Sequence, residues 1–491
     1  MAAMTLAGCS SSEPSAGAGE GEGAHPTALA NVDLANTRTA PSAIDSASVG
    51  DLELAWSLPQ RTKGPYLRYI ASPVVKDGIV FLQDPSSNVE AVDLDSGELL
   101  WERRFEDPVS GPNGVIVIGR VVYGATRTRA IALDAETGEE LWSTPIVGDG
   151  TEQIAMAPGY HDGRVYLSTA TFAGEGDEVG VLWALDARTG RKLWHFDTVP
   201  RGLWGNPEIN YGGGIDFTPA FDGEGSMFIG VSGPGPVPGT ARYPWGSSRP
   251  GPNLYSNSIV KLDERSGEIE WFHQVTPHAV CAGGFGPPVL ARAGGRKIVT
   301  AVGLGGIAVA LDSASGELLW RHPLGIHNGH DHDGLLAMRG EAERLKLPLV
   351  SYPGIYGGVF GPISLRGSTA YIAVNNGAVR VTSQESLEAV GSYRSELIAL
   401  NVGTGKIEWK HDLPDPILGP TTVTNDLVLA SSLGGDVFAL DADSGERVWG
   451  AKLPDHSEGG MAVVGKDLLV RSGSFGLYGE MPRLVAYRLG E

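Results

Sequence analysis

Cysteine is almost absent from this sequence. Only Cys9 and Cys281 occur among 491 residues, which excludes a disulfide framework and any metal site built from several thiolates. Positive charge is also scarce, because 37 Lys and Arg stand against 58 Asp and Glu for a formal net charge of −21. Nucleic-acid phosphates require a face rich in Lys and Arg, so the charge balance argues against nucleic acid as a partner. No window approaches the apolar length of a membrane span.

Glycine and proline are abundant by contrast. The chain contains 70 Gly and 32 Pro, spread without a collagen-like period among many β-branched residues and 11 Trp. This composition is typical of many short strands joined by tight turns. The length fits either several domains or one large ring of repeats, so length alone does not choose between them.

The first residues resemble the end of a bacterial lipoprotein signal. Cys9 follows Leu6-Ala7-Gly8, a run of small residues like those at which a peptidase cuts before a cysteine that becomes lipidated. We therefore predict that residues 1–9 are part of a signal whose true start lies upstream, and that residues 10–50 form a flexible tether. The alternative is a chance run of small residues in a disordered tail. The lipid anchor predicts a membrane-bound protein outside the cytoplasm.

One pattern recurs along the chain and predicts a hairpin in each copy. It consists of a small residue, an apolar residue, Asp, three residues, Gly, three residues and Trp, as in Ala132-Leu133-Asp134, Gly138 and Trp142. Asp can accept hydrogen bonds from turn amides, Gly supplies a positive φ, and the large indole can fill the wedge between neighbouring sheets. Seven copies, one with Asn in place of Asp and one without the small residue, end at Trp101, Trp142, Trp194, Trp271, Trp320, Trp409 and Trp449.

The two ends of the chain carry complementary halves of one more repeat. Leu52 to Trp56 has the Trp strand without preceding strands, whereas residues 466–470 and 484–487 supply strands without a following Trp. Joining these halves removes exposed sheet edges. We therefore predict an all-β fold over residues 51–491: an eight-bladed β-propeller of four-stranded antiparallel sheets, closed by a blade shared between the termini and expected to be monomeric. A solenoid of β-hairpins is the alternative.

Two intervals between successive Trp residues are much longer than the others, which predicts insertions at residues 201–256 and 325–395. The second contains the densest group of potential ligands, near His322 and followed by the Tyr352–Gly358 run that could form an aromatic wall. Imidazoles at this spacing suit Zn²⁺ or Cu²⁺ and carboxylates suit Ca²⁺, but a solvated polar loop explains the cluster as well. The candidate divalent-metal ligands are His327, His330, Asp331, His332 and Asp333.

The repeat resembles that of the pyrroloquinoline quinone (PQQ) propeller superfamily, which includes quinoprotein alcohol dehydrogenases and the assembly-factor lipoprotein of the outer-membrane barrel machinery. Residues 212–214, 220–222, 251–258 and 274–278 are closer still to the fourth blade of the dehydrogenases. The resemblance implies a quinone in a central funnel, on a tryptophan floor and below a disulfide of adjacent cysteines, with Ca²⁺ held by Glu, Asn and Asp and a catalytic Asp nearby.

Most positions implied by this resemblance carry other residues. The floor Trp falls on Asp216, the calcium Asn falls at Ser232-Gly233-Pro234, and the catalytic Asp falls in residues 279–283, which read Ala-Val-Cys-Ala-Gly. The adjacent cysteine pair is missing, although Glu175 or Glu178 could supply the Glu. PQQ is therefore not expected as a cofactor.

Substitutes for the missing groups are few. Trp204 or Trp245 could stack on a flat ligand or merely cover a sheet edge, and Cys281, three residues from His278, fits an inert buried thiol better than a nucleophile. We interpret the protein as a lipid-anchored binding or scaffold propeller of the cell envelope that recognises another envelope protein or a small ligand. The alternative is an oxidoreductase that uses the quinone or a loop-bound metal with substituted residues.

Overall fold

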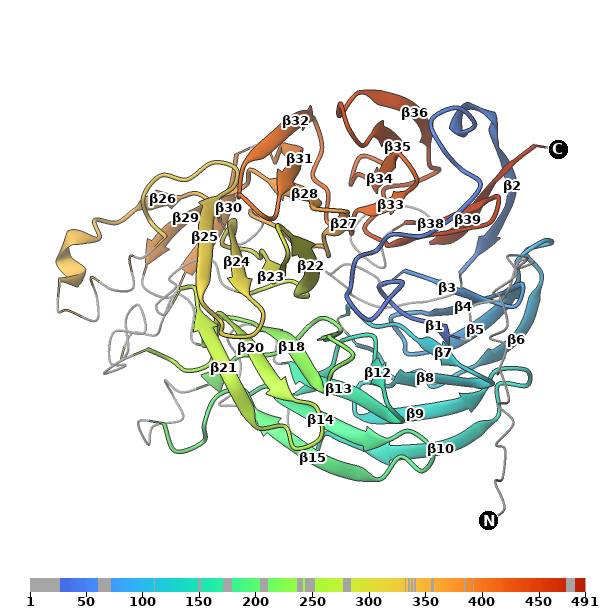
Figure 1. The fold of residues 1–491 in the computed structure, drawn as a ribbon, viewed down its shortest axis with the longest axis horizontal. Coiled ribbons are helices and arrows are strands. Elements are labelled where there is room, and N and C mark those ends of the chain that lie inside the picture. The colour runs from blue at the N-terminus through green and yellow to red at the C-terminus, as the bar shows by residue number, and fades with distance from the viewer. Residues whose placement is uncertain are drawn as a thin grey trace, which may run out of the picture.

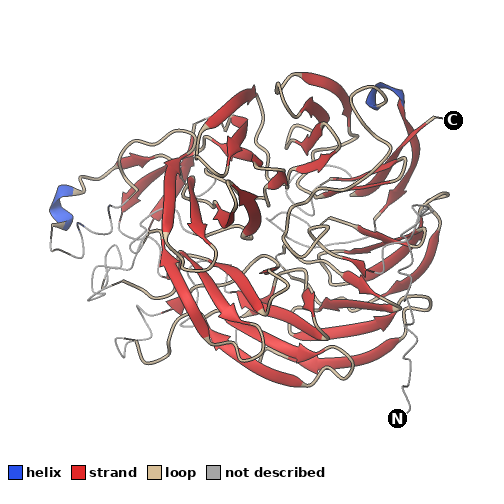
Figure 2. Ribbon diagram, in the orientation of Figure 1, coloured by secondary structure: helices blue, strands red, loops and turns tan. Residues whose placement is uncertain are grey.

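The structure is a computed structural model of residues 1–491. It describes residues 27–60, 72–109, 111–148, 152–170, 179–203, 211–235, 242, 252–276, 284–331, 333, 336, 339, 341–354, 357–383, 386–391, 393–473 and 482–490. Figure 2 shows these residues almost wholly as strands and loops, with two short helical turns, η1 (Val49–Asp51) and η4 (Ala342–Arg344). The predicted all-β class is therefore confirmed. No helix in the described ranges is long and apolar enough to cross a membrane.

Eight antiparallel sheets of four or five strands contain most of the described strands. The first four, named here in chain order, comprise β3 (Val74–Lys76), β4 (Ile79–Gln83), β5 (Val89–Asp93) and β6 (Leu99–Arg103); β1 (Thr27–Ala28), β7 (Ile116–Ile118), β8 (Val121–Ala125), β9 (Arg129–Asp134) and β10 (Glu140–Pro145); β11 (Gln153–Ile154), β12 (Gly159–His161), β13 (Arg164–Ala170), β14 (Val181–Asp186) and β15 (Lys192–Asp197); β17 (Ala220–Phe221), β18 (Ser226–Val231), β20 (Ser258–Asp263) and β21 (Ile269–Gln274).

The remaining four sheets continue in the same order, and the last combines strands from both ends of the chain. They comprise β22 (Val289–Ala293), β23 (Arg296–Ala301), β24 (Ile307–Asp312) and β25 (Leu318–Pro323); β27 (Ser364–Arg366), β28 (Thr369–Asn375), β31 (Ser395–Asn401) and β32 (Ile407–Leu413); β33 (Thr422–Thr424), β34 (Leu427–Ser431), β35 (Asp436–Asp441) and β36 (Arg447–Lys452); β2 (Leu52–Pro59), β39 (Arg483–Leu489), β38 (Asp467–Ser472) and β37 (Met461–Val464).

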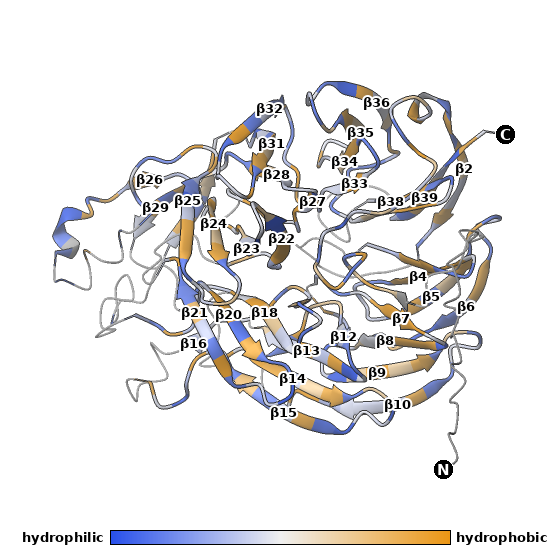
Figure 3. Ribbon diagram, in the orientation of Figure 1, coloured by the Kyte–Doolittle hydropathy of each residue, from blue (hydrophilic) through white to orange (hydrophobic). Residues whose placement is uncertain are grey.

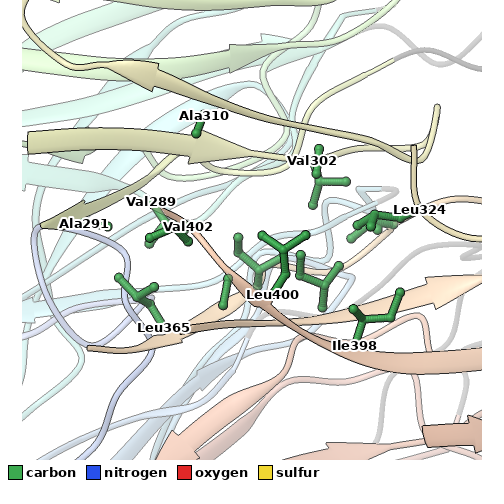
Figure 4. Packing of buried hydrophobic residues seen from close by; sticks show 14 of the residues in the cluster. Val289, Ala291, Val302, Ala310, Leu324, Leu365, Ile398, Leu400 and Val402 are labelled. Carbon is green, nitrogen blue, oxygen red and sulfur yellow. The ribbon is translucent and has the colours of Figure 1, made fainter. Parts of the chain in front are cut away.

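Figure 1 shows the sheets following one another around a common centre, with β6, β10, β15, β21, β25, β32, β36 and β2 on the perimeter. Burial follows this arrangement, because β18 nearer the centre is buried throughout whereas the perimeter strand β32 alternates between half-buried and exposed residues. Figure 3 shows the same alternation of polar and apolar residues along the perimeter. Apolar side chains also fill the space between neighbouring sheets, as Figure 4 shows for Val289 and Val302 of one sheet region and Ile398 and Leu400 of the next.

The predicted insertions contain both regular blade strands and additional structure. Strands β17 and β18 of the fourth sheet lie within residues 201–256, and β27 and β28 of the sixth lie within residues 325–395. The additional strands form two small sheets, in which β16 (Tyr211–Gly212) pairs with β19 (Pro234–Gly235), and β29 (Ala378–Ser383) lies between β26 (Leu349–Ser351) and β30 (Ser386–Val390).

Seven of the eight repeated Trp residues reach the hairpin turn of the next sheet. The Trp271 Nε1 donates to the Ser313 carbonyl oxygen at 3.2 Å, and the ring lies against Gly316 in the turn between β24 and β25. The same indole-to-carbonyl bond is made by Trp56, Trp101, Trp142, Trp194, Trp320 and Trp409. Trp449 packs instead against Tyr487 of the eighth sheet, at a ring-centroid distance of 5.6 Å.

The repeated Asp closes the turn beneath the indole. The Asp312 carboxylate accepts hydrogen bonds from the Ala314 and Ser315 amides and the Ser315 hydroxyl at 3.0 to 3.1 Å. The backbone and hydroxyl hydrogen bonds from Ser315 lower the pKa of Asp312, because they favour the ionised carboxylate. Gly316 adopts a φ of +73°, which a residue with a side chain adopts at a cost.

The sequence predicted a flexible tether over residues 10–50, but residues 27–45, called the central segment below, are hydrogen-bonded to the sheets. Its backbone carbonyls accept hydrogen bonds from the innermost strands of successive sheets: Leu34 from Phe221, Ala35 from Leu290, Thr37 from Leu365 and Arg38 from Val423, at 2.7 to 3.0 Å. At its start Ala28 pairs with Val117 of β7, and near its end the Ala43 amide donates to Gly465. These bonds order residues 27–50 against the sheets, whereas residues 10–26 lie outside the described residues.

Arg38 bonds the central segment to residues at or next to the innermost strands of the first, seventh and eighth sheets. Its side chain is only 1% exposed. The guanidinium donates to the Thr421 carbonyl at 2.8 Å, the Thr422 hydroxyl at 2.8 Å, the Ser72 hydroxyl at 2.9 Å and the Met461 carbonyl at 3.3 Å. A buried charge requires such partners, since an unsatisfied one costs several kcal/mol.

We expect Gly316→Ala to lower the free energy of unfolding by about 2–4 kcal/mol, because a Cβ there would lie 2.7 Å from Trp271 Cδ2 in addition to the positive φ. Gly163→Ala is the matched control: Gly163 has a φ of +75° but no atom within 4 Å of its built Cβ, so a loss of about 1–2 kcal/mol is expected. Urea unfolding followed by tryptophan fluorescence measures both. Equal losses would show that the indole contact is unimportant.

Candidate functional site

Asp216, where the resemblance places the floor Trp, is in direct contact with the first residue of Ser232-Gly233-Pro234, the run in which the resemblance places the calcium Asn after a Ser-Gly pair. The Ser232 hydroxyl, directly after β18, donates to the Asp216 carboxylate at 2.9 Å. The Ser232 amide also donates to the Gly214 carbonyl at 2.8 Å, and its carbonyl accepts from Asn257, so the backbone at this point is held from two sides. Asp216, where the resemblance implies an aromatic floor, thus presents a carboxylate bonded to a hydroxyl.

The stretch that resembles the dehydrogenases most closely is buried and serves the backbone. Asn253, Ser256, Asn257 and Ser258 are each no more than 1% exposed. The Asn257 side chain accepts from the Gly284 amide at 2.7 Å and donates to the Thr276 carbonyl at 3.1 Å. Buried backbone groups need such partners, and the Asn257 side chain supplies them here.

His327 is more enclosed than His330, and both of its ring nitrogens have partners. Nδ1 lies 2.8 Å from an Asp331 carboxylate oxygen and Nε2 lies 3.0 Å from the Leu324 carbonyl oxygen. A carbonyl oxygen only accepts, so Nε2 carries a proton. Burial lowers the pKa of His327, but the hydrogen bond and charge of Asp331 and the nearby backbone outweigh it, and the pKa is raised overall. His327 must give up a bond before it can bind a metal.

His330 forms a second, separate pair. Its Nδ1 lies 2.5 Å from an Asp333 carboxylate oxygen, and Asp333 itself is 7% exposed. The loop therefore holds two His–Asp couples, and within the described part of the chain no group of three or more His, Cys, Asp or Glu side chains is placed to hold a metal ion. His332 lies outside the described residues, so the metal site remains a prediction.

Hydrogen bonds fix this loop to the neighbouring additional sheet. The Asn328 side chain donates to the Val350 carbonyl at 2.7 Å and accepts from the Tyr352 amide at 3.0 Å. The Ile326 amide donates to the Asn376 side chain at 2.8 Å. His327 also lies beside Gly306, where a Cβ would be 3.1 Å from its Nε2. The loop and the start of the expected aromatic wall thus meet. His322 lies apart on β25, opposite Ala308.

Several predicted site residues lie outside the described residues. They are Cys9, Glu175, Glu178, Trp204, Trp245, His278 and Cys281. Sequence analysis assigned no role to the central segment, although Asn36 and Arg38 are among its most connected residues. A single Asn or Arg in a short polar stretch carries no periodic pattern, so no sequence signal identified them.

The sequence matches the PQQ_2 family, described as outer membrane protein assembly factor BamB, over residues 22–110, 86–215 and 365–483, together more than half of the chain. The chain belongs to this family, and the suspected PQQ-type repeat is confirmed.

Among curated proteins the chain is similar to the quinohemoprotein alcohol dehydrogenase of Comamonas testosteroni, with 28% identity over 86% of this chain and 68% of that protein. Quinohemoprotein alcohol dehydrogenase ADH-IIG of Pseudomonas putida is 26% identical over 83% of this chain and 66% of its own length. The chain thus spans about two thirds of the length of these relatives.

Solved structures establish the same fold. The Comamonas testosteroni enzyme superposes with a TM-score of 0.80 at 22% identity, covering 95% of this chain and 80% of that one. A europium-containing methanol dehydrogenase gives 0.77 at 18% identity, covering 95% and 98%. BamB from Moraxella catarrhalis gives 0.52 at 14% identity, covering 89% and 97%. The four-stranded antiparallel sheets therefore match those of the dehydrogenase propellers more closely than those of BamB.

We expect Asp331→Asn to lower the pKa of His327, because the hydrogen bond and charge of the Asp331 carboxylate no longer oppose burial. In the unmutated protein the pKa of His327 is raised, so its ion pair with Asp331 stabilises the folded loop. This stabilisation is complete below the unfolded pKa of about 6.5 and is lost as the pH rises through the folded pKa. NMR titration of the imidazole resonances and amide exchange at Ile326 measure both effects. Glu388→Gln, which removes an exposed carboxylate on β30, should change neither.

Proposed function

We propose that the eight sheets are the blades of a closed propeller and that the eighth completes the ring. Support comes from contacts on both sides of that sheet. Toward the first sheet, Trp56 donates to the Leu94 carbonyl at 2.9 Å and Arg471 donates to the Gln83 carbonyl at 2.8 Å. Toward the seventh sheet, Tyr487 packs against Trp449. Within the sheet, β2 pairs with β39 from Leu52–Leu489 to Pro59–Arg483.

On this scaffold we propose a binding or scaffold protein of the cell envelope whose quinone site no longer functions. The hydrogen bond between Asp216 and Ser232 is the observation that carries this proposal. An ionised carboxylate cannot stack on a flat ring, and Gly233 and Pro234 offer no side-chain amide to a cation. At the expected floor, one Asp216 carboxylate oxygen instead accepts a hydrogen bond from Ser232. The partner is another envelope protein or a small ligand.

An oxidoreductase is the second candidate. The similarity to the quinohemoprotein alcohol dehydrogenase of Comamonas testosteroni over 86% of this chain favours an oxidoreductase. The two His–Asp couples favour it too, because an imidazole oriented by a carboxylate is a common general base. In this case substituted residues would hold the quinone, or the loop would hold a metal. The described residues around Asp216 do not fit the quinone, so we assign no reaction step to it.

The quinone test separates the two candidates. We expect the purified protein to show no saturable change in quinone absorbance and no rise in melting temperature with PQQ and either Ca²⁺ or Eu³⁺, because floor and amide are missing. The Comamonas testosteroni enzyme, freed of its cofactors, serves as positive control. Metal-dependent saturation together with dye-linked alcohol oxidation by this protein would overturn the proposal in favour of the oxidoreductase.

We further propose that lipidated Cys9 anchors the protein to a membrane outside the cytoplasm. Acyl chains bind by burying methylene groups in the bilayer, and the acidic protein surface offers no electrostatic attraction to anionic lipid. In cells that express the complete gene, Cys9→Ser is expected to move the protein from the membrane to the soluble fraction. Cys281→Ser, the matched control, should leave it membrane-bound. Equal fractionation of the two variants would contradict lipid anchoring.

A further inference from the structure

A cavity of about 550 Å³ lies between the central segment and the innermost strands of the fourth, fifth and sixth sheets. Its apolar wall contains Phe221 of β17, Leu290 of β22, Ile298 of β23 and Leu365 of β27. Small-molecule sites commonly measure roughly 300–1,000 Å³ and combine apolar walls with a few polar groups. The cavity is distinct from the Asp216–Ser232 contact, because neither residue lines it.

The central segment supplies the other wall through alternate residues. Asn36 and Arg38 turn toward the sheets and hydrogen-bond to them, whereas the residues between them face the cavity. Asp33 has both carboxylate oxygens engaged, by the Thr37 amide at 2.9 Å and by the Thr37 hydroxyl. The cavity-lining residues of the segment are Asp33, Ala35, Thr37 and Thr39.

Two opposite charges line the cavity without satisfying each other. One carboxylate oxygen of Asp222 accepts from the Glu224 and Ser226 amides at 2.8 and 3.0 Å, which leaves its Oδ2 without a partner among the described residues. Arg292, exposed on β22, forms no hydrogen bond or ion pair within the described part of the chain, although Lys297 across the same hairpin pairs with Glu224. The cavity thus has an anionic side on the fourth sheet and a cationic side on the fifth.

We propose that this cavity binds an amino-acid zwitterion with an apolar side chain. The Arg292 guanidinium holds the ligand carboxylate, since its planar donors match a carboxylate with two parallel hydrogen bonds. Asp222 Oδ2 accepts from the ligand ammonium, and the nearby Asp33 carboxylate adds attraction on that side. The ligand side chain lies on Phe221, Ile298 and Leu365. A ligand with one charge only would leave either Arg292 or Asp222 unpaired and is bound more weakly.

The test uses L-leucine as probe with the intact protein, measured by saturation-transfer NMR and calorimetry. Saturable binding of L-leucine is expected. Arg292→Gln and Asp222→Asn should each weaken binding by about tenfold or more, because each removes a charged hydrogen bond. Asparagine keeps the Oδ1 acceptor that holds the turn at residues 222–226, so D222N is expected to fold. Arg296→Gln, on the same hairpin but away from the cavity, should bind within about twofold of the unmutated protein.

Two analogues of L-leucine, each lacking one of its two charges, test the recognition of each charge separately. Leucinamide keeps the ammonium and loses the carboxylate, whereas 4-methylpentanoate keeps the carboxylate and lacks the ammonium. Both should bind about tenfold or more weakly than L-leucine, and R292Q should no longer distinguish L-leucine from leucinamide. No saturable binding of L-leucine up to roughly 10 mM, or binding that R292Q and D222N leave unchanged, would overturn the proposal.

Discussion

The contact between an indole ring and the next hairpin turn is the interaction on which this structure depends. Each sheet buries one face against its neighbour, and the indole fixes the distance because the Gly of the turn, as at Gly316, leaves no room for a Cβ. The indole N–H bonds a carbonyl of the same turn, which fixes its orientation as well, as Trp271 does with Ser313. A repeated contact of this kind turns a linear series of hairpins into a curved one, because every step has the same geometry.

The perimeter contacts have a counterpart at the centre. The central segment runs past the innermost strands and bonds them through its backbone, and Arg38 extends these bonds to Ser72, Thr422 and Met461. The indoles join each sheet only to the next one, whereas this segment joins sheets that are not neighbours. The cavity lies on one side of the central segment, whereas on the other side Asn36 and Arg38 hydrogen-bond to the sheets. The same short stretch thus holds the sheets together and lines the proposed binding cavity.

Sequence predicted those parts of the structure that depend on local spacing. The Asp-to-Trp pattern identified the hairpin that precedes each of seven repeated Trp residues, because turn, strand and indole lie within about ten residues of each other. It missed the central segment, since Arg38 acts on Thr421, which is 383 residues away. The resemblance placed Asp216 where the dehydrogenases have a floor Trp, but the sequence did not predict its bond to Ser232, because the two residues lie on different connections. The His–Asp loop was found by composition, and only coordinates separate it into two couples.

The pairing of β2 with β39 has a consequence for biosynthesis. Leu52 lies opposite Leu489, so β2 has no partner until β39 has been synthesised. During synthesis an unpaired edge of eight residues is exposed, the kind of edge to which other chains can add.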